Sequence, residues 1–158
     1  MDKFMSIANE LSRQNITTNN GGPFGAVVVK DNVIVGVGNN RVLDSNDPTA
    51  HGEVMAIRNA CKNLNTYDLS DCVLYTSCYP CPMCLSTTIW ANIKEIYYGN
   101  TKEDAADIGF RDDFIYDYLH SLSEGKENNE TLVLKSMGRE ETIKVFEEFK
   151  NKTDKTIY

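Results

Sequence analysis

The stretch HGEVMAIRNACKNLNTYDLSDCVLYTSCYPCPMC, residues 51–84, decides the fold of this 158-residue chain. It opens with His51 and Glu53 and closes with Cys81 and Cys84. Between them, the apolar run 73–76 predicts a buried strand. Helices are predicted on both sides, one opened near residue 47 and running to about 63, the other running from 82 to about 91. The stretch therefore predicts a helix–strand–helix unit with metal-binding side chains at two helix starts.

The rest of the chain continues this alternation of helices and strands. Further helices are predicted at 2–15, 112–121 and 139–150, and further strands at 26–30, 33–37, 95–98 and 131–135. A polar loop is expected at 121–130 and a short tail at 151–158. Strands alternating with helices favour a layered α/β sandwich with a mixed sheet of five strands. The length suits a single domain spanning 1–158.

The composition argues against several classes of protein. The net charge is −7 and no cluster of Lys and Arg is visible, which disfavours a long nucleic-acid substrate unless folding assembles a basic patch. No apolar run approaches the ~20 residues that span a bilayer, and the first residues lack a secretory signal. The five cysteines are an odd number, which argues against a disulfide framework. We expect a cytoplasmic protein without a membrane partner.

The His and Cys residues of the opening stretch predict a catalytic zinc centre with one Zn²⁺ per chain. One His and two Cys suit Zn²⁺, and three protein ligands leave a fourth position for water. Helix starts carry partial positive charge, which favours thiolates at Cys81 and Cys84. Glu53 follows His51 by two residues, close enough to handle the proton of that water.

Two other interpretations of these residues stay open at this point. Cys78 precedes Cys81 by three residues and would close the shell as a fourth ligand, which makes an inert, structural Cys₃His site. A lone C-x-x-C is also typical of a redox pair. Neither gives a reason for the carboxylate of Glu53, so we favour catalysis.

At these residues the chain resembles the cytidine-deaminase-like superfamily, whose signature is H-x-E followed by P-C-x-x-C. The resemblance covers almost the whole length and implies a three-layer α/β/α sandwich. Several segments resemble bacterial guanine deaminases: GGPFGAVVVKD (21–31), NN (39–40), SNDPTAHGEV (45–54), LYTSCYPCPMC (74–84), GFRDDFIYD (109–117) and the tail ending in Tyr158. Two positions depart from that group: Gly52 stands where Ala is usual, as in fungal cytosine deaminase, and Tyr79 stands where Glu is usual.

The resemblance implies four substrate-binding residues. Phe24 would provide an aromatic face for the base, and Asn40 would hydrogen-bond a ring nitrogen or carbonyl. Asp112 would accept from N–H groups of guanine, and Tyr158 would close the pocket. Each has a structural alternative: Phe24 as core, Asn40 as a turn residue, Asp112 as a helix N-cap and Tyr158 as a frayed terminus.

The resemblance also implies a homodimer in which a C-terminal segment of about 138–158 is exchanged between subunits. The expected reaction is zinc-dependent hydrolysis of a nucleobase, guanine to xanthine plus ammonia, with Glu53 as the catalytic residue. Cytosine and guanosine are the alternative substrates, and a tRNA adenosine is disfavoured by the acidity. A non-catalytic, zinc-stabilised binding module is the alternative from a different class.

Overall fold

The computed structural model describes residues 2–158, which divide into two compact units. The first ends at Tyr116 and the second comprises Asp117–Tyr158. No helix of the described residues is both long and apolar enough to cross a membrane. The elements follow in the order α1 Lys3–Thr18, β1 Gly25–Lys30, β2 Val33–Asn39, α2 Val42–Ser45, α3 Gly52–Leu64, β3 Cys72–Cys78, α4 Pro82–Trp90, β4 Ile96–Asn100, α5 Lys102–Asp107, α6 Asp113–Ser123 and α7 Arg139–Asn151.

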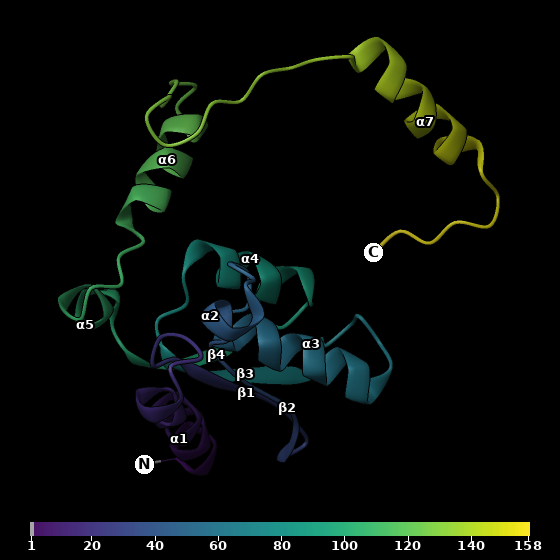
Figure 1. The fold of residues 1–158 in the computed structure, drawn as a ribbon. Helices are drawn as coiled ribbons and strands as arrows, with labels where there is room; N and C mark the ends of the chain where they lie inside the picture. Colours follow the sequence, from purple (N-terminus) through teal and green to yellow (C-terminus); the bar gives the residue numbers. More distant parts are fainter. Residues whose placement is uncertain (1) are drawn as a thin grey trace. The chain divides into compact units, whose positions relative to one another are not determined.

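The first unit contains a mixed sheet with the strand order β2-β1-β3-β4 (Figure 1). β1 pairs antiparallel with both β2 and β3, whereas β3 and β4 are parallel. The hairpin between β1 and β2 turns at Asp31 and Asn32, which both adopt positive φ, as a two-residue turn of this kind requires. The mixed α/β fold expected from the sequence is confirmed.

The sheet has four strands among the described residues, so the prediction of a fifth strand at 131–135 was wrong. That segment belongs to the second unit, where Leu132, Val133 and Leu134 are all exposed. A strand exists only where its backbone N–H and C=O groups pair with a neighbour. No strand of residues 117–158 offers such a neighbour, so an apolar, β-prone sequence remains without regular structure.

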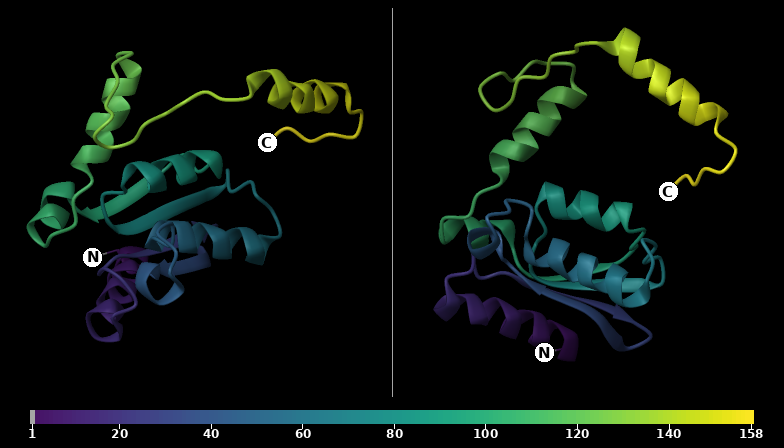
Figure 2. Two further views of the ribbon diagram at one scale, coloured as in Figure 1. Left: turned by 45° about the horizontal axis from the view of Figure 1, so that its top comes forward. Right: turned by 45° about the vertical axis from the view of Figure 1, so that its right-hand side comes forward.

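The first unit has three layers, as predicted. α1 packs against β1 and β3, and α3 and α4 lie together on the opposite face of the sheet (Figure 2). Gly38 allows α3 to approach β2 closely, because a Cβ there would lie only 2.4 Å from the carbonyl oxygen of Gly52. This contact sets the height of the first turn of α3 above the sheet.

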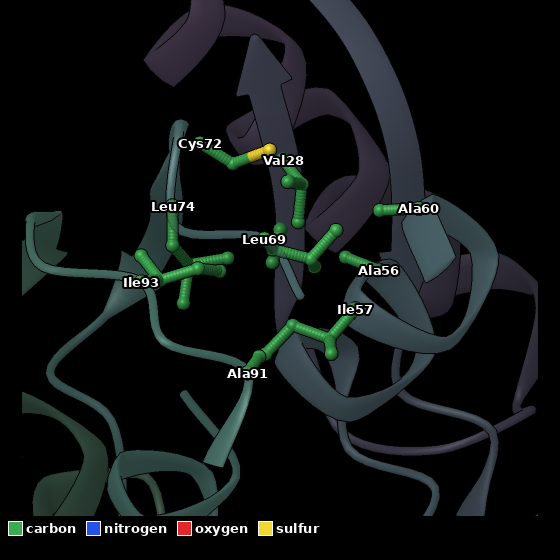
Figure 3. Packing of buried hydrophobic residues seen from close by; sticks show 10 residues of the cluster. Val28, Ala56, Ile57, Ala60, Leu69, Cys72, Leu74, Ala91 and Ile93 are labelled. Atoms are coloured by element: carbon green, nitrogen blue, oxygen red, sulfur yellow. The ribbon is translucent and has the colours of Figure 1, made fainter. Parts of the chain in front are cut away.

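The core is split by β1, whose side chains alternate between two clusters. Val27 and Val29 face α1 and pack with Phe4. Val28 faces the other side, where it joins the larger cluster under α3 (Figure 3), which comprises Ala26, Val28, Ala56, Ile57, Ala60, Leu69, Cys72, Leu74, Ala91 and Ile93. β1 is therefore buried on both faces, and it holds β3 rigidly beneath the ends of α3 and α4.

Candidate active site

Two helix starts bring the predicted metal ligands together. His51 is the N-cap residue of α3 and Cys81 is the N-cap residue of α4, both with extended backbone. Pro82 occupies the first turn of α4, where its missing N–H costs nothing. Cys84 lies in the same turn and is fully buried. α3 begins later than the sequence indicated, because the Asp47 carboxylate accepts from the amide of Thr49 and closes a turn before the helix.

The distances within this group match a tetrahedral zinc site. The Nδ1 atom of His51 lies 3.5 Å from Cys81 Sγ and 3.6 Å from Cys84 Sγ. The three atoms lie within 4.8 Å of one another and form a group that can hold one metal ion. With Zn–S of about 2.3 Å and Zn–N of about 2.0 Å, tetrahedral geometry separates N and S by about 3.5 Å. The donor set therefore fits Zn²⁺ without rearrangement.

The electrostatics of the three groups favour a cation. Hydrogen bonds from Cys84 and His51 lower the pKa of Cys81 to about 4, so that its sulfur is a thiolate at neutral pH. The contact with that sulfur raises the pKa of His51. The pKa of Cys84 is raised, because its sulfur interacts with that of Cys81 and is buried. The three side chains share protons among themselves, and a bound divalent cation would displace these protons.

Glu53 is a buried carboxylate beside these ligands, with only 6% of its surface exposed. The hydroxyl of Thr76 on β3 donates to Oε1 at 3.1 Å, and the Cys84 thiol donates to Oε2 at 3.4 Å. Burial affects the pKa of Glu53 more than any other cause does, and it raises that pKa. A carboxylate that takes up a proton readily and is held in one orientation suits general acid–base catalysis.

Cys78 is kept out of the ligand group. Its thiol donates to the carbonyl oxygen of Thr101 at 3.4 Å, and burial raises its pKa to about 11. It is therefore a neutral thiol in the metal-free protein. Among the described residues the metal-binding group comprises His51, Cys81 and Cys84 alone. This arrangement leaves room for a fourth, non-protein ligand.

A cavity of about 620 Å³ opens above the ligand group and is lined by His51, Glu53 and Cys81. Phe24, Asn40 and Asp112 also line it. Three of the four residues predicted to bind substrate therefore share one cavity with the ligand group. The fourth, Tyr158, belongs to the second unit and has 84% of its surface exposed.

Phe24 and Asn40 approach the cavity from the β1 and β2 ends. Phe24 meets the ring of Phe110 edge to face, with centroids 5.0 Å apart, so the two form an aromatic corner. Asn40 is buried and its Oδ1 accepts from the amide of Val42 at 3.1 Å. Asn40 therefore also acts as a turn residue, which was its structural alternative. Its side-chain amide nitrogen is the donor that it can offer to a ligand.

Asp112 presents a carboxylate to the same cavity. The neighbouring Arg111 is engaged elsewhere, because its guanidinium pairs with Asp113 at 2.5 Å. The carbonyl oxygen of Asp112 accepts from the amides of Ile115 and Tyr116, so Asp112 stands at the start of α6, where the N-cap alternative places it. Burial raises its pKa. Asp112 is thus a half-buried carboxyl group in the wall of the cavity.

Sequence reasoning missed several residues that shape the site. Thr76 orients Glu53, and the only available signal was a hydroxyl within an otherwise apolar buried run. Phe110 lines the cavity from the segment 109–117, in which the resemblance singled out Asp112 instead, and Lys102 lines it from a segment that carries no motif of its own. Tyr79 also lines it and packs against Tyr98 with ring centroids 5.1 Å apart.

The other departure, Gly52, does not face the cavity. A Cβ at this position would lie 3.1 Å from the carbonyl oxygen of Phe24. Glycine here relaxes the packing of α3 on the start of β1, and it changes no group that contacts a ligand.

Comparisons with known proteins agree with this geometry. Residues 1–100 match the family model for the cytidine and deoxycytidylate deaminase zinc-binding region. Guanine deaminase from Bacillus subtilis is 43% identical over 99% of this chain and 98% of its own length, and its crystal structure superposes with a TM-score of 0.90 over 100% of this chain and 99% of that chain. A solved guanine deaminase from Nitrosomonas europaea is 34% identical with a TM-score of 0.65 over 69% of this chain and 63% of that one.

A tRNA-specific adenosine deaminase from Buchnera aphidicola is 34% identical over 82% of both chains. The family match thus spans more than half of the chain, and it includes the His–Cys–Cys group. The chain belongs to the cytidine and deoxycytidylate deaminase family of zinc-binding proteins.

Proposed function

We propose that the protein is a zinc-dependent aminohydrolase that converts guanine and water into xanthine and ammonia. One observation carries this proposal. A buried carboxylate, Glu53, lies beside a His–Cys–Cys group with tetrahedral zinc distances, under a cavity that also holds the acceptor Asp112. The full-length similarity to a guanine deaminase supports guanine over other bases.

In this proposal His51, Cys81 and Cys84 hold one Zn²⁺ per chain. The zinc ion, when bound, supplies a water molecule whose pKa is lowered toward neutrality. The two thiolates and one neutral imidazole balance its charge, which a buried site requires. The N-terminal ends of α3 and α4 carry partial positive charge. Both lie at the ligand group, where they stabilise the thiolates.

Glu53 handles all the protons of the reaction. It takes the proton of the attacking water, whose oxygen bonds to the amino-bearing carbon of the base. Glu53 delivers that proton to the adjacent ring nitrogen, then takes the second proton from the new hydroxyl group on the carbon and passes it to the amino group. The C–N bond breaks, ammonia leaves and the carbonyl group of xanthine forms. One carboxylate suffices because these transfers occur in sequence. Thr76 donates to Oε1 and so fixes the orientation of the carboxylate.

The walls of the cavity select the base. The aromatic corner of Phe24 and Phe110 contacts the faces and edges of a planar ring. Asn40 donates from its amide nitrogen. Asp112 accepts from N–H groups, which guanine provides and cytosine lacks at the corresponding edge. Buried polar groups reject a ligand that leaves them unpaired more strongly than apolar walls do.

The proposed assembly is a homodimer of a single deaminase domain, 1–158, in which a segment of about 138–158 is exchanged and Tyr158 closes the partner's cavity. Its support is an amphipathic α7 whose apolar residues remain exposed: Val145, Phe146 and Phe149. Helices of this kind normally bury that face. Exchange of an identical element is a low-cost route to a dimer. The proposed location is the cytoplasm, because all five cysteines are free thiols.

Metal content tests the ligand assignment. The purified protein should carry about one Zn²⁺ per chain, with X-ray absorption showing two sulfur and one nitrogen ligand plus a light fourth atom. Cys81→Ala should lose zinc, and Cys78→Ala should keep it because Cys78 donates to Thr101 instead. Loss of zinc in Cys78→Ala, or a third sulfur ligand, would contradict a catalytic centre.

Replacement of the catalytic carboxylate tests the mechanism. Glu53→Gln keeps the shape but removes the proton acceptor, so kcat should fall by at least ~10³-fold. Zinc content and the melting temperature should stay close to the original values, which excludes loss of the fold as the cause. A zinc-loaded Glu53→Gln protein with ordinary activity would rule out the proposed proton transfers.

Substrate choice is tested with guanine, guanosine, cytosine, cytidine and adenine, scored by ammonia release. Guanine should exceed cytosine in kcat/KM by ~10⁴-fold, since an unpaired buried acceptor discriminates on this scale. Asp112→Ala should reduce kcat/KM for guanine far more than for cytosine. If cytosine is converted faster than guanine, the enzyme is a cytosine deaminase and Asp112 has another role.

A mixing experiment tests the exchanged tail. Deletion of 155–158 should raise KM and lower kcat, together by about 10-fold or more, because an open cavity positions the base poorly. The truncated protein is then refolded with full-length Glu53→Gln. If tails cross between subunits, mixed dimers regain activity, because an intact Glu53 site receives an intact tail. Normal turnover by the truncated protein, or no gain on mixing, contradicts the exchange.

A further inference from the structure

Asn15 is a buried polar residue that takes no part in the proposed chemistry. It lies in the last turn of α1, and only 5% of its surface is exposed. The cavity is lined by its neighbours Gly22 and Asn40, and not by Asn15 itself. A buried side-chain amide needs hydrogen-bond partners, because an unpaired polar group away from water is costly. The partners of Asn15 therefore indicate what this residue does.

The side-chain nitrogen of Asn15 joins two segments that lie far apart in the chain. Nδ2 donates to the carbonyl oxygen of Gly22 and to the carbonyl oxygen of Asn40, each at 2.8 Å. Gly22 belongs to the loop between α1 and β1, and Asn40 directly follows β2. Oδ1 accepts from the hydroxyl of Thr18 at 3.1 Å and from the side-chain amide of Asn39 at 3.3 Å. Both ends of the amide are thus engaged, which fixes its orientation.

These two segments also bond directly to each other through Phe24. The amide of Phe24 donates to the carbonyl oxygen of Gly22 at 2.9 Å, and the amide of Asn40 donates to the carbonyl oxygen of Phe24 at 3.0 Å. Together with the two bonds from Asn15, they close a ring of hydrogen bonds that runs through Asn15, Gly22, Phe24 and Asn40. The ring holds the backbones of the two proposed base-binding residues, Phe24 and Asn40, at a set separation.

The side chain of Asn40 follows the position of its backbone. Its Oδ1 accepts from the amide of Val42, and a Cβ at Gly21 would lie only 2.0 Å from that oxygen. The backbone amide bonds to Phe24, and the carbonyl oxygen bonds to Asn15. A displacement of the carbonyl group of Asn40 would therefore also move the side-chain nitrogen that Asn40 offers to a ligand.

We propose that Asn15 is a positioning residue for the base: it sets the separation between Phe24 and Asn40 across one wall of the cavity. The inference rests on the proposed binding of guanine by these two residues. The hydrogen bonds of Asn15 run to α1 itself, to the loop before β1 and to the end of β2. Glu53 and the metal ligands stand on α3 and α4. Loss of Asn15 should therefore weaken binding of the base and leave the reacting groups in place.

The test uses Asn15→Asp, which keeps the size of the side chain and Oδ1 but replaces the donating nitrogen with an oxygen. A carboxylate only accepts, so the carbonyl oxygens of Gly22 and Asn40 lose this donor. KM for guanine should rise about tenfold, which corresponds to about 1.4 kcal/mol and to the loss of one or two buried hydrogen bonds. The value of kcat should stay within about threefold and zinc content should not change, because a loss of binding alone raises KM.

Asn59→Asp is the matched control. Asn59 is also a helix residue, on α3, and its Nδ2 donates to a carbonyl oxygen of β2, that of Val37, at 2.8 Å. Neither Asn59 nor Val37 lines the cavity. The same substitution there should leave KM unchanged, so an equal rise in KM in both variants would show a general effect on the sheet and overturn the inference.

A second variant covers the case in which the new charge in Asn15→Asp prevents folding. Asn15→Ala keeps α1, because Ala is the best helix former, and it lets water reach the two carbonyl oxygens. It should raise KM in the same direction by a smaller factor. A folded, zinc-loaded Asn15 variant with an ordinary KM, or one that loses kcat instead, contradicts a positioning role.

Binding without turnover separates this inference from the proposed function. Zinc-loaded Glu53→Gln protein should bind guanine about tenfold more weakly when it also carries Asn15→Asp. In an Asn40→Ala background the added effect of Asn15→Asp should be smaller, because the two residues act through a shared contact. If the effects of Asn15→Asp and Asn40→Ala on KM simply multiply, or if only Asn40→Ala raises KM, the inference fails and the proposed function stands. Failure of the function itself would show in the unmodified protein, which would then release no ammonia from guanine.

Discussion

The buried carboxylate of Glu53 beside two cysteine sulfurs is the interaction on which the rest of this structure depends. Negative groups gathered away from water destabilise one another unless protons, hydrogen bonds or a cation offset their charge. Thr76 and the Cys84 thiol supply hydrogen bonds, and the starts of α3 and α4 supply partial positive charge. Burial raises the pKa of Glu53 most, and the Cys81 sulfur adds to this effect. A divalent cation would offset the negative charge of the same group.

The sheet holds Glu53 and the cysteine sulfurs in this arrangement. β1 is buried on both faces and supports β3, from which Thr76 reaches Glu53. Gly38 lets α3 pack closely on β2, and this close packing fixes the positions of His51 and Glu53 relative to the sheet. A helix displaced by a side chain at Gly38 would move both residues away from the cysteines of α4.

The proposed substrate-binding residues come from other elements than the metal ligands. Phe24 and Asn40 come from the β1 and β2 ends, whereas Phe110 and Asp112 come from the segment between α5 and α6. Such segments are less constrained than helix starts that pack on a sheet, and they are where related enzymes can vary in substrate. Tyr79 and Lys102 also line the cavity. In the proposed function, the metal ligands and the substrate-binding residues therefore come from different segments of the chain.

The second unit illustrates a different physical limit. The segment 131–135 and α7 both carry apolar residues that remain exposed. Their sequence patterns predict surfaces that can pair with a strand or pack against a helix. Such a pattern does not identify the partner. An apolar helix face is stable when it packs against another surface, which is the reason for the proposed homodimer.

The sequence alone determined the helix–strand alternation, the metal-binding set and the place of Glu53, because these depend on local spacing: Glu53 follows His51 by two residues, and Cys84 follows Cys81 by three. Resemblance to a family extended this to Phe24, Asn40 and Asp112. Only the tertiary structure decided that Cys78 bonds to Thr101, that Thr76 orients Glu53 and that 131–135 lacks a strand partner. It also decided that the ammonium of Lys102 lies over the ring of Tyr116. Each of these depends on contacts between residues far apart in the chain or on the presence of a neighbour, and no local pattern encodes either.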